Sequence, residues 1–175
     1  MRVVDDQGRV VADGELGEIV VKSTTNMLGY WRLPEQTAET VRDGWLHTGD
    51  IGYRDEEGYY FLKDRKKDVV VSGGENIYPN EVERVLLLHD AINDVAVIGV
   101  PDEKYGESVL AFCVMKPGQV LDKTSLIAYC RDHLAGYKIP RQYKVVDELP
   151  RNPSGKVLKT HLREPYWQHA GRRIG

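Results

Sequence analysis

The stretch that decides the fold is VAVIGVPDEKYGESVLAFCVM, residues 95–115. Two apolar runs, Val95–Val100 and Val109–Met115, have the length and composition of buried strands. The polar segment Pro101–Gly106 separates them and is typical of a loop. These residues therefore predict two buried strands joined by a polar connection.

Patterns of helices and further strands flank this pair on both sides. The helix predicted at residues 79–88 has its apolar side chains on one face: Val82, Val85 and Leu86. Asp122 can cap a second helix, which we expect to end at Gly136. Three more elements complete the pattern: strands at residues 69–71 and 142–146, and a last helix from about residue 158 that Pro165 disturbs.

The order of these elements is strand, helix, strand, strand, helix, strand, followed by a loop and a helix. Such an order is typical of α+β domains, in which helices pack on a sheet. We therefore predict a small α+β domain with a short mixed sheet and with its helices packed on one face of that sheet.

The first 60 residues are typical of β structure with one helix. Two hairpins are predicted, around the turns Asp5–Gly8 and Asp55–Gly58, and a further strand is predicted at residues 18–22. A helix is expected at Pro34–Arg42, and Asp43-Gly44 should break it.

A domain boundary is expected at Lys63–Asp68. All six residues of this stretch are charged, which is incompatible with a place in a core. We therefore divide the chain into a β-rich domain at residues 1–66 and the α+β domain at residues 67–175.

Composition and charge restrict the class of protein. The chain has 175 residues, of which 41% are hydrophobic and 29% are charged, a balance typical of soluble globular proteins. The net charge of -3 argues against a nucleic-acid partner. Residues 136–175, however, carry a charge of +6 and are a candidate surface for anions.

Cysteines and histidines exclude two kinds of site. Cys113 and Cys130 are too few for a disulfide framework or a cysteine-rich zinc module. The five histidines have no metal-ligand spacing, so we assign no metal site and treat them as structural or surface residues. No apolar run is long enough to cross a bilayer. We expect a cytoplasmic protein with buried thiols and without a transmembrane segment.

Two segments in the first half carry candidate chemistry, and each has a simpler explanation. In His47–Asp50, the carboxylate of Asp50 can accept hydrogen bonds from adjacent hydroxyls, as on a ribose ring. A Gly-Asp pair is nevertheless more often a turn. In Arg65–Gly74, the glycines allow a backbone to approach a ligand closely, although a solvated charge run is the simpler interpretation.

The third segment is Asn152–Lys156. It is not a phosphate-binding P-loop, because Pro150 stands where that motif needs glycine and Val157 stands where it needs Ser or Thr. What remains is a loop with proline and glycine that presents Lys156 within the basic region. A plain surface lysine is the simpler alternative.

Together these segments resemble the motifs of adenylate-forming enzymes, the superfamily of acyl-CoA synthetases, peptide-synthetase adenylation domains and luciferases. The four matching motifs follow in the family's order: Gly44–Asp50, Asp64–Asp68, Val71–Glu83 and Leu149–Lys156. The stretch Gly14–Tyr30 is also similar to the family, so the resemblance covers nearly the whole chain.

The resemblance implies a role for each candidate residue. Asp50 would hold the ribose hydroxyls, and Arg65 would also contact the nucleotide. Lys156 would be the catalytic lysine of the first half-reaction, placed between the substrate carboxylate and the α-phosphate.

It also implies three residues that serve the second half-reaction. Lys67 falls at the hinge position, about which the small domain rotates. Gly73 and Gly74 would line the passage of the coenzyme A pantetheine, where a larger side chain would block the thiol.

The family's large N-terminal domain is represented here only by a β-rich remnant of its last strands. By resemblance, residues 1–66 are the end of that domain and residues 67–175 are the mobile C-terminal domain. The implied function is the C-terminal part of a fatty-acid–CoA ligase, whose substrates are a small-molecule carboxylate, ATP and coenzyme A, and which releases AMP. Mg²⁺ would bind to the parent enzyme through ligands outside this sequence, and the chain alone would be inactive.

Two other functions stay open. The stretch Ser72–Ile77 resembles CoA ligases more than peptide-synthetase domains, yet an adenylation domain that serves a carrier protein is an alternative. The other is a stand-alone module that binds an anion or a protein partner through its basic end.

Overall fold

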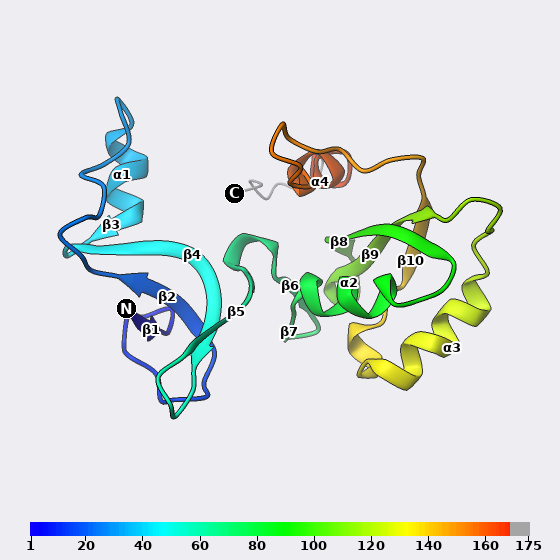
Figure 1. Ribbon diagram of the computed structural model, residues 1–175, viewed down its shortest axis with the longest axis horizontal. Coiled ribbons are helices and arrows are strands. Elements are labelled where there is room, and N and C mark those ends of the chain that lie inside the picture. The colour runs from blue at the N-terminus through cyan, green and yellow to red at the C-terminus, as the bar shows by residue number, and fades with distance from the viewer. Residues whose placement is uncertain (169–175) are drawn as a thin grey trace. The chain divides into compact units, whose positions relative to one another are not determined.

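The computed structural model describes residues 1–168 of the 175-residue chain. The chain is divided into two compact units, Met1–Lys67 and Asp68–Gly175 (Figure 1). The division falls after Lys67, one residue beyond the boundary expected from the charged stretch.

The first unit is an antiparallel sheet of five strands. The strands run in the order β1, β2, β4, β3, and β5 also pairs with β4. The two predicted hairpins are present, because Val4 pairs with Val10 and β4 pairs with β5. The elements are β1 (Arg2–Val4), β2 (Gly17–Val21), α1 (Pro34–Thr40), β3 (Val41–Arg42), β4 (Trp45–Arg54), β5 (Tyr60–Arg65) and the 3-10 turn η1 (Lys66–Asp68).

The helix expected at Pro34–Arg42 ends two residues early, at Thr40. Val41 and Arg42 form β3 instead and pair with β4 across the turn Asp43-Gly44. Both turn residues have positive φ, 50° at Asp43 and 75° at Gly44, which is the geometry of a two-residue hairpin turn. The Asp-Gly pair therefore starts a hairpin, and pairing with the long β4 outweighs the local helical preference.

The second unit is an α+β domain built on a mixed sheet, as predicted. Strand β9 is antiparallel to β8 and β6 and parallel to β10, and β7 pairs with β6. The elements are β6 (Val70–Ser72), β7 (Glu75–Ile77), α2 (Pro79–Leu87), β8 (Ile92–Asp102), β9 (Gly106–Met115), α3 (Lys123–His133), the 3-10 turn η2 (Gly136–Lys138), β10 (Gln142–Val145) and α4 (Lys159–Trp167).

Helices cover both faces of this second sheet (Figure 1). In β8, Val95 and Val97 pack in one apolar cluster, whereas Ala96 and Ile98 pack in another. Successive side chains of a strand point to opposite faces, so the two clusters lie on opposite faces of the sheet. The first cluster includes side chains of α2 and α3, and the second includes side chains of α4. The expectation of helices on one face is therefore wrong, because an unbroken apolar run needs cover on both faces.

The ends of two helices also differ from expectation. The predicted cap of α3 is confirmed, since Asp122 accepts hydrogen bonds from the backbone of Thr124 and Ser125. The helix ends at His133, before Gly136, because Leu134 is extended and buried. Helix α4 continues through Pro165, which lies on the exposed side, where water can satisfy the carbonyl that proline leaves unpaired.

Candidate functional site

Asp50 and Arg65 lie opposite each other on the paired strands β4 and β5. Side chains of directly paired residues share one face of a sheet. Arg65 Nη1 lies 2.9 Å from Asp50 Oδ1 and donates to the carbonyl oxygen of Thr48 at 3.0 Å. The side chains of Arg65 and Asp50 are 41% and 33% exposed, so the pair is accessible to a ligand.

The backbone before Asp50 has a conformation that favours glycine. Gly49 has a φ of 70°, and it lies within β4, so the Gly-Asp pair is part of a strand and not of a turn between strands. The Thr48 hydroxyl donates to the carbonyl oxygen of Ile19 at 2.7 Å and accepts from the Asp50 N–H at 3.1 Å. The pairing of β2 with β4 shifts register beside this segment, and such an irregularity re-aims a side chain.

Glu18 supports this segment from β2, and the sequence analysis did not single it out. The residue is 9% exposed. Its Oε1 accepts the Gly49 N–H at 3.1 Å, and its Oε2 lies 3.2 Å from Lys66 Nζ and 3.3 Å from His47 Nδ1. A carboxylate within the apolar strand Gly17–Val21 was the available signal, because buried charges need partners.

The environment of Glu18 favours its charged form. Burial has the largest single effect and raises the pKa of the Glu18 carboxyl. Hydrogen bonds from His47, Lys66 and Gly49, together with the positive charge of Lys66, lower this pKa by a larger amount. The net result is a pKa below the ordinary glutamate value. Glu18 therefore prefers its charged form in the folded unit, and it ties β4 to Lys66, the residue following β5.

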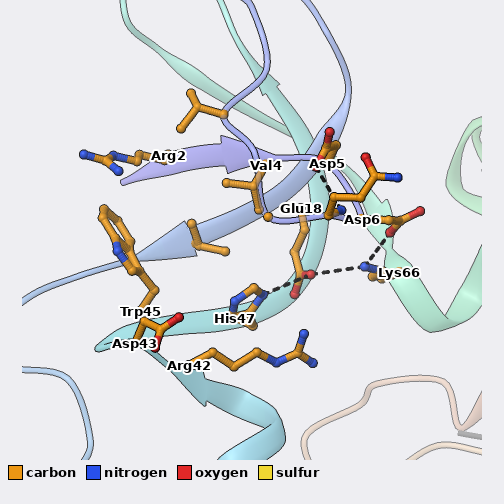
Figure 2. A pocket seen from close by; sticks show the side chains of 14 residues that line it. Arg2, Val4, Asp5, Asp6, Glu18, Arg42, Asp43, Trp45, His47 and Lys66 are labelled. Atoms are coloured by element: carbon orange, nitrogen blue, oxygen red, sulfur yellow. Dashed lines mark hydrogen bonds and ion pairs between the residues drawn. The ribbon is translucent and has the colours of Figure 1, made fainter.

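Glu18 also lines a pocket of about 280 Å³ (Figure 2). Glu18, His47 and Lys66 line it, and Figure 2 shows the contacts of Glu18 with the other two side chains. Arg2 lies over the Trp45 ring at the same pocket, 4.6 Å from the ring centroid. Asp50 and Arg65, the candidates for nucleotide binding, do not line this pocket. Glu18 connects the two places, because it lines the pocket and also binds the backbone of Gly49, next to Asp50.

Lys67 is exposed and is the last residue of the first unit. Its neighbours are both paired. Lys66 Nζ lies 2.9 Å from Asp6 Oδ1 as well as near Glu18, and Asp68 Oδ1 accepts from Arg163 Nη2 at 2.6 Å. The residue at the expected hinge position is thus flanked by one anchor in each unit.

Gly73 and Gly74 form the exposed turn between β6 and β7. Their φ values are 61° and 89°, so the turn itself requires glycine. The Gly73 N–H donates to the carbonyl oxygen of Tyr105 at 2.8 Å. A side chain at Gly74 would meet nothing within 4 Å, which leaves open space beside this turn.

Lys156 lies in a short hairpin. Arg151 pairs with Val157, and the Asn152 backbone bonds to Gly155 and Lys156. The Asn152 side chain closes the turn, because its Oδ1 accepts from the backbone N–H of Lys156 at 2.8 Å and from both the N–H and the hydroxyl of Ser154. The segment expected as a turn-rich loop is therefore a fastened hairpin with an exposed lysine.

The basic end carries less free charge than its sequence suggests. Seven Lys and Arg residues lie between residues 136 and 168. Four of them pair with carboxylates of the same unit: Lys138 with Glu81, Arg151 with Asp94, Lys159 with Glu83 and Arg163 with Asp68. Lys156 belongs to none of the ion pairs found among the described residues.

The structure brings Asp50 and Arg65 together in the first unit. Gly73 and Gly74 share one turn of the second unit, and Lys156 lies on a separate hairpin of that unit. Within residues 1–168, no group of three or more His, Cys, Asp and Glu side chains is placed to hold a metal ion. The helices described are too short or too polar to cross a membrane.

Comparisons with known proteins agree on one family. Residues 81–156 match the family model for the C-terminal domain of AMP-binding enzymes. A fatty acid–[acyl-carrier-protein] ligase, ScoC of Streptomyces coeruleorubidus, is 44% identical over 173 residues, which cover 99% of this chain and 33% of that protein. A long-chain-fatty-acid–CoA ligase of Bacillus subtilis is 49% identical over 160 residues, which cover 91% of this chain and 29% of that protein.

A solved structure gives the same result. The o-succinylbenzoate CoA synthetase of Bacillus subtilis, in complex with its acyl-adenylate intermediate, matches with a TM-score of 0.86 and 41% identity. The match covers 93% of this chain and 33% of that chain. The present chain thus spans about a third of the length of the relatives it matches.

Proposed function

Because this chain belongs to the family of adenylate-forming enzymes, we propose that it forms the C-terminal part of an ATP-dependent acid–thiol ligase. In this proposal residues 1–66 are the end of the large N-terminal domain, and residues 67–175 are the mobile C-terminal domain. The observation that carries the proposal is an exposed lysine on a fastened hairpin, within a chain whose other unit presents an accessible carboxylate–guanidinium pair.

The proposed reaction has two steps. A carboxylate oxygen attacks the α-phosphorus of ATP, and the bond from that phosphorus to the oxygen of the β-phosphate breaks. Pyrophosphate departs, and the product is an acyl-adenylate. The thiol of coenzyme A then loses its proton and attacks the acyl carbon, and the bond to AMP breaks to give a thioester. Mg²⁺ would accompany ATP and would be held in the parent enzyme by residues outside this sequence.

Asp50 and Arg65 suit the nucleotide. A carboxylate can accept hydrogen bonds from both hydroxyls of a ribose, and such charge-assisted bonds contribute about 1.5–3 kcal/mol each. Arg65 orients the Asp50 carboxylate from one side, while a third of the Asp50 side chain stays exposed. This geometry supports a role for Asp50 in holding the ribose and for Arg65 in contacting the nucleotide.

Lys156 suits the transfer of charge in the first step. Negative charge grows on the α-phosphate as the carboxylate attacks, and a cation placed there lowers the barrier, an effect worth on the order of 10²–10³ in rate. The Lys156 side chain is exposed and can contact a phosphate, because no carboxylate among residues 1–168 pairs with it. We assign Lys156 as the catalytic lysine of adenylate formation.

Lys67, Gly73 and Gly74 suit the second step. Lys67 stands at the division of the two units, which supports its assignment as the hinge. The open space at Gly74 supports a passage for the pantetheine of coenzyme A, since only a residue without a side chain leaves that space free.

A fatty acid is the carboxylate that we favour. Both curated relatives described above are named as fatty-acid ligases, one acting with coenzyme A and one with acyl-carrier protein. Because one relative is a carrier-protein ligase, a thiol bound to a carrier protein is the alternative acceptor of the acyl group.

A stand-alone module that binds a polyanion is disfavoured, because four of the seven Lys and Arg side chains near the basic end are already paired. Two buried free thiols support a cytoplasmic location.

The test is Lys156→Ala in the complete ligase, with the two half-reactions measured separately. We expect pyrophosphate release to fall by about 10²–10³, while thioester formation from preformed acyl-adenylate stays near the wild-type rate. Lys116→Ala removes an exposed lysine elsewhere in the second unit and should leave both rates unchanged. An equal loss in both half-reactions would contradict the assigned role.

We also propose that the 175-residue chain alone makes no thioester. Its relatives are about three times as long, and by resemblance to the family we expect the adenine and acyl sites to lie outside this sequence. The chain would be mixed with ATP, coenzyme A and a panel of carboxylates, and thioester would be measured. Robust turnover would refute the proposal.

A further inference from the structure

One arginine fastens the Lys156 hairpin to the sheet. Arg151 Nη2 donates to Asp94 Oδ2 at 2.5 Å, and Arg151 Nη1 donates to the carbonyl oxygen of Gly155 at 2.5 Å. A single guanidinium therefore connects the residue directly before Lys156 to strand β8, although Asp94 and Arg151 are 57 positions apart in the chain.

Asp94 is itself held in a defined orientation. Its Oδ1 accepts the backbone N–H of Val95 at 2.9 Å, and Val95 is buried in the core. The pairing of β8 with β9 shifts register between Ile92 and Asp94, and an irregularity of this kind aims a side chain away from the regular alternation. The carboxylate is thus a fixed acceptor on a rigid element.

The hairpin is also fixed on the far side of Lys156. The next residue, Val157, packs against the cluster that contains Leu149 and Leu162. The backbone N–H of Lys156 is bound by the Asn152 side chain. The peptide units on both sides of Lys156 are therefore restrained, while its long side chain remains exposed.

We propose that Arg151 and Asp94 are positioning residues that hold the hairpin in the orientation from which Lys156 reaches the reacting phosphate. This inference rests on the proposed function of Lys156. A lysine side chain is flexible, so the place of its ammonium group depends on the backbone that carries it. A shift of about 1 Å at a reacting group can lower a rate by about 10²-fold, which makes a distant ion pair kinetically important.

The experiment uses the complete ligase and the variant Asp94→Asn, which keeps the shape of the side chain and removes its charge. We expect kcat for pyrophosphate release to fall at least about tenfold, with KM for ATP unchanged. Thioester formation from preformed acyl-adenylate should stay within about twofold of the wild-type rate. Arg151→Lys keeps the positive charge but cannot bind Asp94 and the Gly155 carbonyl oxygen at the same time, as the guanidinium does. The rate of the Arg151→Lys enzyme should therefore lie between those of the wild type and of Arg151→Gln.

A double variant separates positioning from general damage. If Asp94 acts through Lys156, then Asp94→Asn added to Lys156→Ala should slow adenylate formation no further than Lys156→Ala alone. Damage to the unit as a whole would add to the effect of Lys156→Ala. The control is Asp13→Asn, which breaks the Arg54–Asp13 pair of comparable exposure in the first unit and should change neither half-reaction.

Two results would overturn the proposal while leaving the function of Lys156 intact. One is an Asp94→Asn enzyme that forms adenylate within about twofold of the wild-type rate, and the other is an equal loss in both half-reactions. If Lys156→Ala itself forms adenylate at the wild-type rate, the proposed function of Lys156 fails, and the positioning role fails with it.

Discussion

Glu18 shows how one buried carboxylate organises a polar site. It binds the Gly49 N–H on β4 and lies near Lys66 and His47, so three segments of the first unit meet at a single side chain. Its pKa lies below the ordinary value because His47 and Lys66 outweigh the effect of burial. The folded unit therefore prefers the ionised form, and its stability depends on pH.

Replacing Glu18 by Gln should destabilise the first unit at neutral pH by about 1–3 kcal/mol, the contribution of hydrogen bonds to a charged group. The stabilisation by Glu18 is fully present above the ordinary glutamate pKa of about 4.3. It is lost as pH falls through the lower pKa of the folded state. Chemical denaturation of both proteins at several pH values should show a difference that shrinks below about pH 4.

The matched control is Glu39→Gln, because Glu39 is exposed in α1 and its side chain forms no ion pair among the described residues. It should change stability little at any pH. A Glu18→Gln effect that is the same at pH 7 and at pH 3 would show that the charge of Glu18 is not responsible.

Helix α4 is an element whose place depends on polar contacts along one side. Lys159 pairs with Glu83 of α2, Arg163 pairs with Asp68, and Trp167 Nε1 donates to the carbonyl oxygen of Gly99 on β8. Residues four positions apart lie on the same side of a helix, so these three side chains form one row. The row fixes α4 across the sheet face opposite α2 and α3, directly after the Lys156 hairpin.

Arg163→Ala should therefore destabilise the second unit. The Arg163 and Asp68 side chains are 8% and 13% exposed, and removing one partner of a nearly buried ion pair costs about 3–5 kcal/mol. Urea denaturation would measure the loss. Arg131→Ala, at an exposed position of α3, is the control and should cost little.

A double variant, Arg163→Met with Asp68→Asn, tests the cause of that loss. It removes both charges, so it should recover part of the stability lost in Arg163→Ala. No recovery would mean that packing by the arginine stem, and not the unpaired carboxylate, accounts for the effect.

For the whole molecule, the main feature is that each unit has a core of its own. The first unit buries Val3, Val4, Ile19 and Val20, and the second unit has two clusters on either side of its sheet. The second unit, with its two clusters, has the kind of core that allows a domain to fold independently. The movement that we propose at Lys67 would then require no change inside either core.

A polypeptide of residues 68–175 should therefore unfold in one cooperative step. Its urea midpoint, followed by circular dichroism, should match one of the two transitions expected for the whole chain. The absence of a cooperative transition in the shorter polypeptide would contradict the independence of the second unit.

Short-range features were predictable because they depend on neighbouring residues. The apolar runs of β8 and β9 and the cap at Asp122 follow from local patterns. The helix that ends early at Thr40 was not predictable in this way, because Val41 and Arg42 are recruited by a strand that follows them. The four family motifs likewise drew attention to Asp50, Arg65 and Lys156, but not to the side chains that support them.

The sequence by itself determined the α+β class of the second unit, the mixed sheet and the family, since these are encoded in periodicity and in short motifs. Only the tertiary structure decided that helices cover both sheet faces, that Glu18 joins Gly49 to Lys66, and that Asp94 holds the Lys156 hairpin through Arg151. The physical reason is distance along the chain. Glu18 and Lys66 are 48 positions apart, Asp94 and Arg151 are 57 apart, and a charge acquires its partner only when the folded sheet brings the two together.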